Sequence, residues 1–291
     1  LSKTYSDNTP QVSYTYDALG RCTSGIVDGV STNTFTYNQF GDPISESQNG
    51  TTVSRTYDNF GRPIGYSLPG ENAYGLSVSY AYDDFGRFST VSAGTNQFTY
   101  SYLQGTPLIA SIDSNFGFSR ATSYENNRDL ISSVNNTFND ATISRYDYTN
   151  DALGRRTSRN DTISASQKQN TFGYNVRNEV VSATLGTNEY TYSYDPIGNR
   201  TALTQNAEAK SYISNPLNQY IAIQQEQQTV APTYDADGNM LSSPSGWSFT
   251  WNAENRLVSA SRGGVVVSYT YDAFGRMISK QIIGAENKTI T

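Results

Sequence analysis

Short stretches of alternating apolar and polar residues recur along the whole chain. Val78, Tyr80 and Tyr82 alternate with Ser79 and Ala81, and similar alternation returns at 98–102, 190–194 and 265–271. A period of two places successive side chains on opposite faces of a β-strand. The pattern therefore predicts strands with one aromatic face and one face of small, mostly hydroxylic residues.

Many of the predicted strands lead into a six-residue motif that holds Asp and Gly. It reads YDALGR at 16–21, and variants follow at 57–62, 82–87, 150–155, 194–199, 234–239 and 271–276. Asp at the first position of a type I turn can bond a backbone N–H two residues on, and Gly at the fourth tolerates positive φ. The motif is therefore predicted to reverse the chain. The residues assigned to these structural turns are Tyr16, Asp17, Gly20, Arg21, Tyr57, Asp58, Gly61, Arg62, Tyr82, Asp83, Gly86, Arg87, Tyr194, Asp195, Gly198, Tyr234, Asp235, Gly238, Tyr271, Asp272, Gly275 and Arg276.

Two variants of the motif favour the same assignment. Pro196 and Pro216 stand at the second turn position, where the φ of proline, about −65°, fits. Asn218 replaces the glycine, and Asn is the residue that best tolerates the left-handed region after Gly. We therefore expect the chain to turn at these degenerate copies too.

The turns recur about every twenty residues. We place thirteen units, at Tyr16, Tyr37, Tyr57, Tyr82, Tyr102, Tyr124, Thr149, Tyr174, Tyr194, Ser214, Tyr234, Trp251 and Tyr271. Such a period is typical of repeat arrays, and each unit reads as one β-hairpin. We therefore predict an all-β fold in which about thirteen hairpins form a continuous, spiralling, solenoid-like or shell-like sheet. One array is expected over 1–291, degenerate at about 103–147.

Composition and charge exclude several classes of function. The chain has 20 basic and 26 acidic residues, a net charge of −6 that repels nucleic acid. One cysteine and no histidine exclude zinc clusters and His-dependent triads, and no apolar run approaches the roughly 18 residues of a membrane helix. We expect no enzymatic activity, catalytic residue, cofactor, metal, nucleic-acid partner or membrane span. The charge-poor, hydroxyl-rich composition favours an extracellular or cell-surface location.

Several residues could carry chemistry but have a simpler explanation. The recurring aspartates could form carboxylate pairs for acid–base catalysis, yet one per hairpin at the same position suits turn formation better. The recurring arginines could neutralise anions across a surface, but pairing with turn carboxylates or lying over tyrosine rings explains them better. The segment Asp235–Asn239 resembles the front of a calcium loop without its distant Glu. Cys22 has no histidine or second cysteine to activate it.

The motifs resemble the YD repeats of the Rhs family, which also occur in shell subunits of insecticidal toxin complexes and in teneurins. Besides the recurring YDxxGR, the resemblance rests on NPLNQY at 215–220, TYDADGNM at 233–240, WNAENRLVSA at 251–260 and YTYDAFGRMISK at 269–280. It implies a β-sheet that spirals into a shell, in family members often a container for a toxic C-terminal segment. A core-associated segment with chain-cutting aspartates and a toxin domain are not recognisable here. We therefore expect a fragment or processed piece of a longer chain, which forms part of the shell wall.

Three functions remain open at this point. The leading hypothesis is a non-enzymatic structural protein, part of a secreted or cell-surface shell, whose partners are neighbouring YD repeats and an encapsulated polypeptide. An unpaired strand at each end of an array would instead template the next copy, and identical chains would then form an extracellular filament. The tyrosine rows could also stack on sugars and make an adhesion surface, although packing between turns of the spiral explains them better.

Overall fold

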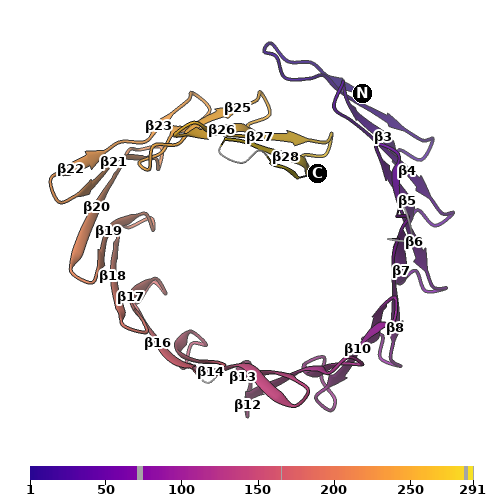
Figure 1. The fold of residues 1–291 in the computed structure, drawn as a ribbon, viewed down its shortest axis with the longest axis horizontal. Coiled ribbons are helices and arrows are strands. Elements are labelled where there is room, and N and C mark those ends of the chain that lie inside the picture. Colours follow the sequence, from indigo (N-terminus) through magenta and orange to yellow (C-terminus); the bar gives the residue numbers. More distant parts are fainter. Residues whose placement is uncertain (71–74, 165, 285–287, 291) are drawn as a thin grey trace. The chain divides into compact units, whose positions relative to one another are not determined.

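The computed structural model describes residues 1–70, 75–164, 166–284 and 288–290. Every regular element among these residues is a β-strand, as Figure 1 shows, so the predicted all-β fold is confirmed. Over the same residues, no helix has the length and apolarity needed to cross a bilayer. Tyrosine, threonine, valine and phenylalanine favour extended backbone, which is consistent with this outcome.

Strands β1 to β22 belong to one 22-stranded sheet. Their bounds are β1 Ser2–Lys3, β2 Val12–Tyr16, β3 Cys22–Val27, β4 Ser31–Tyr37, β5 Pro43–Gln48, β6 Thr51–Tyr57, β7 Pro63–Leu68, β8 Leu76–Tyr82, β9 Phe88–Ala93, β10 Asn96–Tyr102, β11 Ile109–Ser114, β12 Phe118–Glu125, β13 Arg128–Phe138, β14 Ala141–Asn150, β15 Arg156–Ile163, β16 Ser166–Tyr174, β17 Val180–Leu185, β18 Asn188–Tyr194, β19 Arg200–Gln205, β20 Glu208–Ser214, β21 Tyr220–Gln225 and β22 Gln228–Val230.

A second sheet of seven strands follows. Its strands are β23 Thr233–Tyr234, β24 Met240–Ser242, β25 Ser248–Trp251, β26 Leu257–Arg262, β27 Val265–Tyr271, β28 Met277–Ile283 and β29 Lys288–Ile290. Pairing is antiparallel between strands that follow each other in sequence, for example β9 with β10 and β18 with β19. The chain is therefore a succession of hairpins, as the twenty-residue period predicts.

The segment with the weakest repeat signal still forms hairpins, but its strands are longer. Strands β12, β13 and β14 have 8, 11 and 10 residues, against 5 to 7 in most other hairpins. Two residues, Asn126 and Asn127, connect β12 to β13 and replace the usual turn, so Glu125 pairs directly with Arg128. No Asp-x-x-Gly motif ends β12, so the pairing of β12 with β13 continues up to the two connecting residues.

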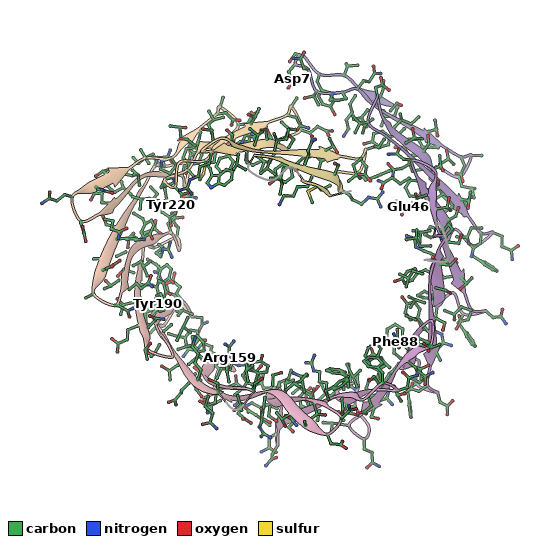
Figure 2. All side chains as sticks on the ribbon, in the orientation of Figure 1. Asp7, Glu46, Phe88, Arg159, Tyr190 and Tyr220 are labelled. Atoms are coloured by element: carbon green, nitrogen blue, oxygen red, sulfur yellow. The ribbon has the colours of Figure 1, made fainter. Side chains whose placement is uncertain are left out.

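The two faces of each strand differ in exposure as the alternation predicts. On β18, Tyr190, Tyr192 and Tyr194 are half-buried, whereas Thr191 and Ser193 between them are exposed. Figure 2 shows side chains on both faces of the sheet, with Phe88 and Tyr190 among those labelled. Aromatic rings also contact each other along one face, and the Tyr190 and Tyr192 ring centroids lie 6.4 Å apart. The aromatic face is thus the more sheltered one.

The chain divides into two compact units. One comprises residues 1–77, 219–222 and 230–291, and the other comprises 78–218 and 223–229. In the first unit a small hydrophobic core forms around Val12, Val27 and Ala273, with Tyr5, Tyr14 and Val30 packed against it. In the second unit the buried side chains are dispersed along the sheet, as Val78, Val134 and Ala183 show. The single array expected over 1–291 stays a prediction.

Candidate functional site

The first turn motif folds into a closed network of hydrogen bonds around Asp17. The backbone N–H of Gly20 donates to the carbonyl of Asp17 over 3.0 Å, and the N–H of Asp17 donates to the carbonyl of Arg21, also over 3.0 Å. The Asp17 carboxylate oxygen Oδ1 accepts 2.9 Å bonds from the N–H groups of Leu19 and Arg21. Gly20 has φ +77°. This is a type I turn followed by a left-handed glycine, which joins the two strands of a hairpin.

The same network recurs in the other Asp-containing turns. Their aspartate Oδ1 atoms accept two backbone N–H groups each, over 2.8–3.0 Å, at Asp58, Asp83, Asp151, Asp195, Asp235 and Asp272. Where the glycine is missing, asparagine takes the left-handed conformation, with φ +65° at Asn178, +61° at Asn218 and +57° at Asn255. Glycine and asparagine both adopt the positive φ that the fourth turn position requires, so the degenerate copies of the motif still form hairpins.

Each arginine of the motif binds its own turn. Oδ2 of the aspartate and the arginine guanidinium lie 2.6–2.7 Å apart in the pairs Arg21–Asp17, Arg62–Asp58, Arg87–Asp83, Arg155–Asp151 and Arg276–Asp272. Both oxygens of the carboxylate are therefore used within the turn. A charge-assisted hydrogen bond of this kind is stronger than one between neutral groups.

Three of these arginines, Arg21, Arg87 and Arg155, also contact the next repeat. The guanidinium of Arg155 donates to the carbonyl of Asn175 over 3.1 Å and lies over the ring of Tyr174, 4.8 Å from its centroid. Arg21 does the same to the carbonyl of Asn38 and the ring of Tyr37. Arg87 donates to the carbonyl of Thr106 and covers the ring of Tyr102. Arginine thus links one turn to the following one.

Tyrosine makes a reciprocal link to the preceding repeat. Each hydroxyl donates to the carbonyl of the first residue of an earlier strand, over 2.7–3.2 Å. The pairs are Tyr37–Cys22, Tyr57–Pro43, Tyr102–Phe88, Tyr124–Ile109, Tyr174–Arg156, Tyr194–Val180, Tyr234–Tyr220 and Tyr271–Leu257. Trp251 substitutes for tyrosine and donates its indole N–H to the carbonyl of Met240 over 2.7 Å. We call these tyrosine and arginine links, with their turn aspartates, the turn ladder.

The turn ladder continues where the sequence motif has decayed. In the degenerate segment, Arg128 binds Glu125 at 2.5 Å in place of an Asp–Arg pair, and its guanidinium donates to the carbonyl of Asp151 over 2.6 Å. Asn199 and Asn239 replace arginine and donate to the aspartates of their turns over 2.8 and 2.9 Å. They also bond the Asn218 and Asn255 side chains of the next turns. The tyrosine hydroxyl and asparagine links have no local sequence signal, because they join residues one repeat apart.

The electrostatics of the turns follow from these contacts. Backbone N–H donation from Arg21, followed by its guanidinium, lowers the pKa of Asp17. At Asp58 and Asp83, desolvation is the largest influence and raises the pKa, but the hydrogen bonds and the arginine together outweigh it and lower the pKa. The carboxylates are held in the charged form that accepts hydrogen bonds.

The Cys22 thiol and the Asp235 carboxylate, which belongs to the calcium-loop-like segment Asp235–Asn239, make local hydrogen bonds. Burial raises the pKa of the Cys22 thiol, which donates to the carbonyl of Ser24 over 3.2 Å. The Asp235 carboxylate is occupied by the N–H groups of Asp237 and Asn239 and by the Asn239 amide. No group of three or more metal-ligating side chains occurs within the described part of the chain. The calcium-loop alternative therefore gains no support from this geometry.

Comparison with solved structures gives the same fold at low sequence identity. The Tc holotoxin pore of Photorhabdus luminescens superposes with a TM-score of 0.55, 14% identity and 96% coverage of this chain. Two crystal structures of TcdB2-TccC3, one without its hypervariable C-terminal region, each give a TM-score of 0.56 and 14% identity over 96% and 97% of this chain. The chain spans only 16–20% of the length of those chains. A search of curated protein sequences gave no match.

The sequence itself also matches a family model, that of the teneurin YD-shell. The match covers residues 106–287, which is more than half of the chain and includes most of the degenerate segment together with the seven later units from Thr149 to Tyr271. This region carries the turn ladder from Arg128 to Tyr271. The predicted relationship to the YD-repeat shell proteins is confirmed, and the chain belongs to the teneurin YD-shell family.

Proposed function

We propose that the chain is a stretch of wall in a secreted or cell-surface YD-repeat shell, where it separates an enclosed polypeptide from the surroundings. The observation that carries the proposal is the turn ladder. It uses the recurrent side chains of the motif to join neighbouring hairpins, so these residues have a structural role in most repeats. The function is non-enzymatic, and the partners are other YD repeats and the enclosed polypeptide.

The family and the fold support a structural role. The sequence matches the teneurin YD-shell, and the matched solved structures are components of the Tc holotoxin and of TcdB2-TccC3. The chain corresponds to about a fifth or less of those chains, so it would form one part of a larger wall. A wall needs neighbouring repeats to stay joined, and the tyrosine and arginine links connect the turns of successive hairpins.

The extracellular location rests on composition. Charged residues are 16% of the chain and hydroxyl and amide side chains are abundant, so solubility depends on neutral polar groups. Exposed apolar residues at the turn tips, such as Phe60 at 85% and Phe85 at 83%, suit a protein that assembles with further sheet. Secretion is tested by fractionating the native host and detecting the chain with an antibody. Recovery from the cytosol alone contradicts this part of the proposal.

Electron microscopy and sedimentation of the purified 291-residue chain test whether it forms part of a shell wall and not a filament. We expect particles of one size that do not lengthen as concentration rises. Threads that persist on dilution would instead establish the filament, and glycan binding lost on Tyr→Ala changes would establish an adhesion surface. Enclosure is tested separately by fusing an unfolded reporter after Thr291 and measuring its lifetime with a protease. Cleavage as fast as that of the free reporter contradicts enclosure by this chain.

A further inference from the structure

The last turn of the repeat is partly buried: its first two residues are enclosed, whereas Phe274 at its tip is 41% exposed. In the first unit, the turn Asp272–Arg276 lies on one face of strands β2 to β5. Asp272 is 0% exposed and Ala273 is 3% exposed. The corresponding residues of the first turn, Asp17 and Ala18, are half-buried and exposed. The last turn is therefore seated in a site formed by residues more than two hundred positions earlier.

Polar groups of the early strands meet the backbone and carboxylate of the partly buried turn. The Tyr14 hydroxyl donates to the carbonyl of Ala273 over 2.6 Å. The side-chain amides of Asn33 and Gln48 both approach Oδ2 of Asp272, at 3.4 Å. Asn33 is itself 0% exposed, so this amide is committed to the contact. A charged carboxylate that is removed from water needs such donors.

The apolar part of the site is shaped around the ring of Phe274. The ring packs edge-on against Tyr14 and Phe35, with centroids 5.9 and 5.3 Å away. Gly25 forms the floor, because a Cβ there would lie 2.8 Å from two ring carbons of Phe274 and 3.0 Å from the Cβ of Ala273. A larger residue at position 25 would force the Phe274 ring or Ala273 to shift away from the strand. The close approach, and not backbone conformation, requires the glycine.

The arginine of the motif completes the match. The guanidinium of Arg276 lies 2.5 Å from a carboxylate oxygen of Glu46, which is labelled in Figure 2, and 2.6 Å from Asp272. The side chain of Glu46 is 14% exposed. Asp, Ala, Phe and Arg of the turn thus each meet a complementary group. We call the binding surface made by Tyr14, Gly25, Asn33, Phe35, Glu46 and Gln48 the turn socket.

Other turns have the same backbone but exposed tips. Leu19 is 75% and Leu153 is 73% exposed, and each follows an alanine in the sequence Asp-Ala-Leu-Gly-Arg. The turns with Phe60 and Phe85 carry Asn59 and Asp84 at the second position instead. Because Ala273 fits against Gly25 with little room to spare, the larger Asn59 and Asp84 side chains would clash in the same seat. The second residue therefore discriminates between turns.

We propose that the turn socket is a binding site for Asp-Ala-(Phe or Leu)-Gly-Arg turns, and that it accepts such a turn from a second copy of the chain when its own turn leaves. The exposed turns at Asp17 and Asp151 are the ligands offered to that copy. Exchange of this kind makes a heterologous contact, in which a turn of one copy meets the socket of another. The inference goes beyond the wall function and does not depend on an enclosed polypeptide.

A peptide-binding experiment with a weakened native turn tests the proposal. In the full chain, Phe274→Ser removes the ring that packs against Tyr14 and Phe35, so the native turn is held less tightly in the socket. The probe is a cyclised peptide of residues 147–160, whose ends Asp147 and Asn160 are register partners in the structure. Two controls are the same peptide with Ala152→Asn and a peptide of residues 79–92, in which Asp84 occupies the second turn position. Binding is followed by fluorescence anisotropy.

We expect the 147–160 peptide to bind the F274S chain at least tenfold more tightly than either control peptide. Adding Gly25→Val to the F274S chain should abolish this preference, because the new side chain fills the seat. The wild-type chain should bind the peptide more weakly than F274S does, since its own turn competes. Equal binding of the three peptides, or binding of none, overturns the proposal.

A second experiment keeps the test valid if the F274S chain does not fold. Ala273→Asn in the otherwise native chain should release the turn, and the backbone amides of residues 274–276 should exchange their hydrogens at least tenfold faster. The matched control is Ala236→Asn, at the second position of an exposed turn. Its own amides should exchange as in the wild type. Unchanged exchange in A273N shows that the socket does not recognise a small second residue and overturns the proposal.

Discussion

The hydroxyl of Tyr174 donates a 2.7 Å hydrogen bond to the backbone carbonyl of Arg156, at the start of strand β15 and eighteen residues earlier. The bond joins the end of the first strand of one hairpin, just before its turn, to the beginning of the returning strand in the preceding hairpin. It explains why the motif carries tyrosine and not phenylalanine. The ring supplies area for the aromatic face, and the hydroxyl supplies the connection between repeats.

Removing only that hydroxyl should weaken the chain measurably. We expect Tyr174→Phe to lower the free energy of unfolding by about 1 kcal/mol, because the ring remains while a partly buried carbonyl loses its donor. Urea unfolding followed by circular dichroism measures the change. The control is Tyr16→Phe, at a tyrosine that is 49% exposed and whose hydroxyl makes no hydrogen bond within the described residues. An equal loss in both variants would contradict the role of the hydroxyl bond.

Comparing Asp83 with its neighbour Asp84 distinguishes the hydrogen bonds of the turn from the effect of a surface charge. Asp83 accepts the N–H groups of Phe85 and Arg87 and pairs with the Arg87 guanidinium, whereas Asp84 beside it is exposed. We expect Asp83→Ala to lower the urea midpoint clearly and Asp84→Ala to change the free energy of unfolding by less than about 0.5 kcal/mol. Asp83→Asn should fall between them, because its amide oxygen still accepts from the backbone. A larger effect at Asp84 would be incompatible with this assignment.

The repeated turn aspartates make stability depend on pH in the acid range. Their pKa is lower in the folded chain at Asp17, Asp58, Asp83, Asp151, Asp195 and Asp235. Their stabilising effect is therefore fully present above the unfolded pKa of about 3.9 and is lost as pH falls through the lower folded values. We expect a constant urea midpoint between pH 5 and 7 and a decline below pH 4. The decline should be shallower in Asp83→Asn.

Local chemistry explains what the sequence predicts well. Asp17, Gly20 and Asn218 act on the backbone within five residues, so their pattern alone predicts the turn and the left-handed position. The alternation around Tyr190 likewise predicts which face is sheltered, because a strand has a fixed period of two. These features need no knowledge of the neighbouring hairpin.

Contacts between repeats could not be read in the same way. The bond from Tyr174 to Arg156 depends on how two hairpins are registered, and no local pattern specifies a backbone carbonyl as the acceptor. The seat of Phe274 against Gly25 joins residues 249 positions apart in sequence, and a glycine in a strand gives only a general hint of close approach. The Glu125–Arg128 pair preserves the ladder with a different motif, so a search for Asp-x-x-Gly passes over it.

Coupling between hairpins should be measurable at Arg155 and Tyr174. The guanidinium lies over the ring at 4.8 Å and donates to the carbonyl of Asn175 in the next turn, while Asp151 holds it at 2.7 Å in its own turn. In a double-mutant cycle of Arg155→Ala and Tyr174→Leu, we expect an interaction free energy above about 0.5 kcal/mol, because both changes remove the same contact. The control cycle combines Arg155→Ala with Tyr194→Leu, one repeat further on, and should be additive. Additivity in the first cycle would mean that the arginine stabilises only its own turn, and the turn ladder would then be a set of independent hairpins.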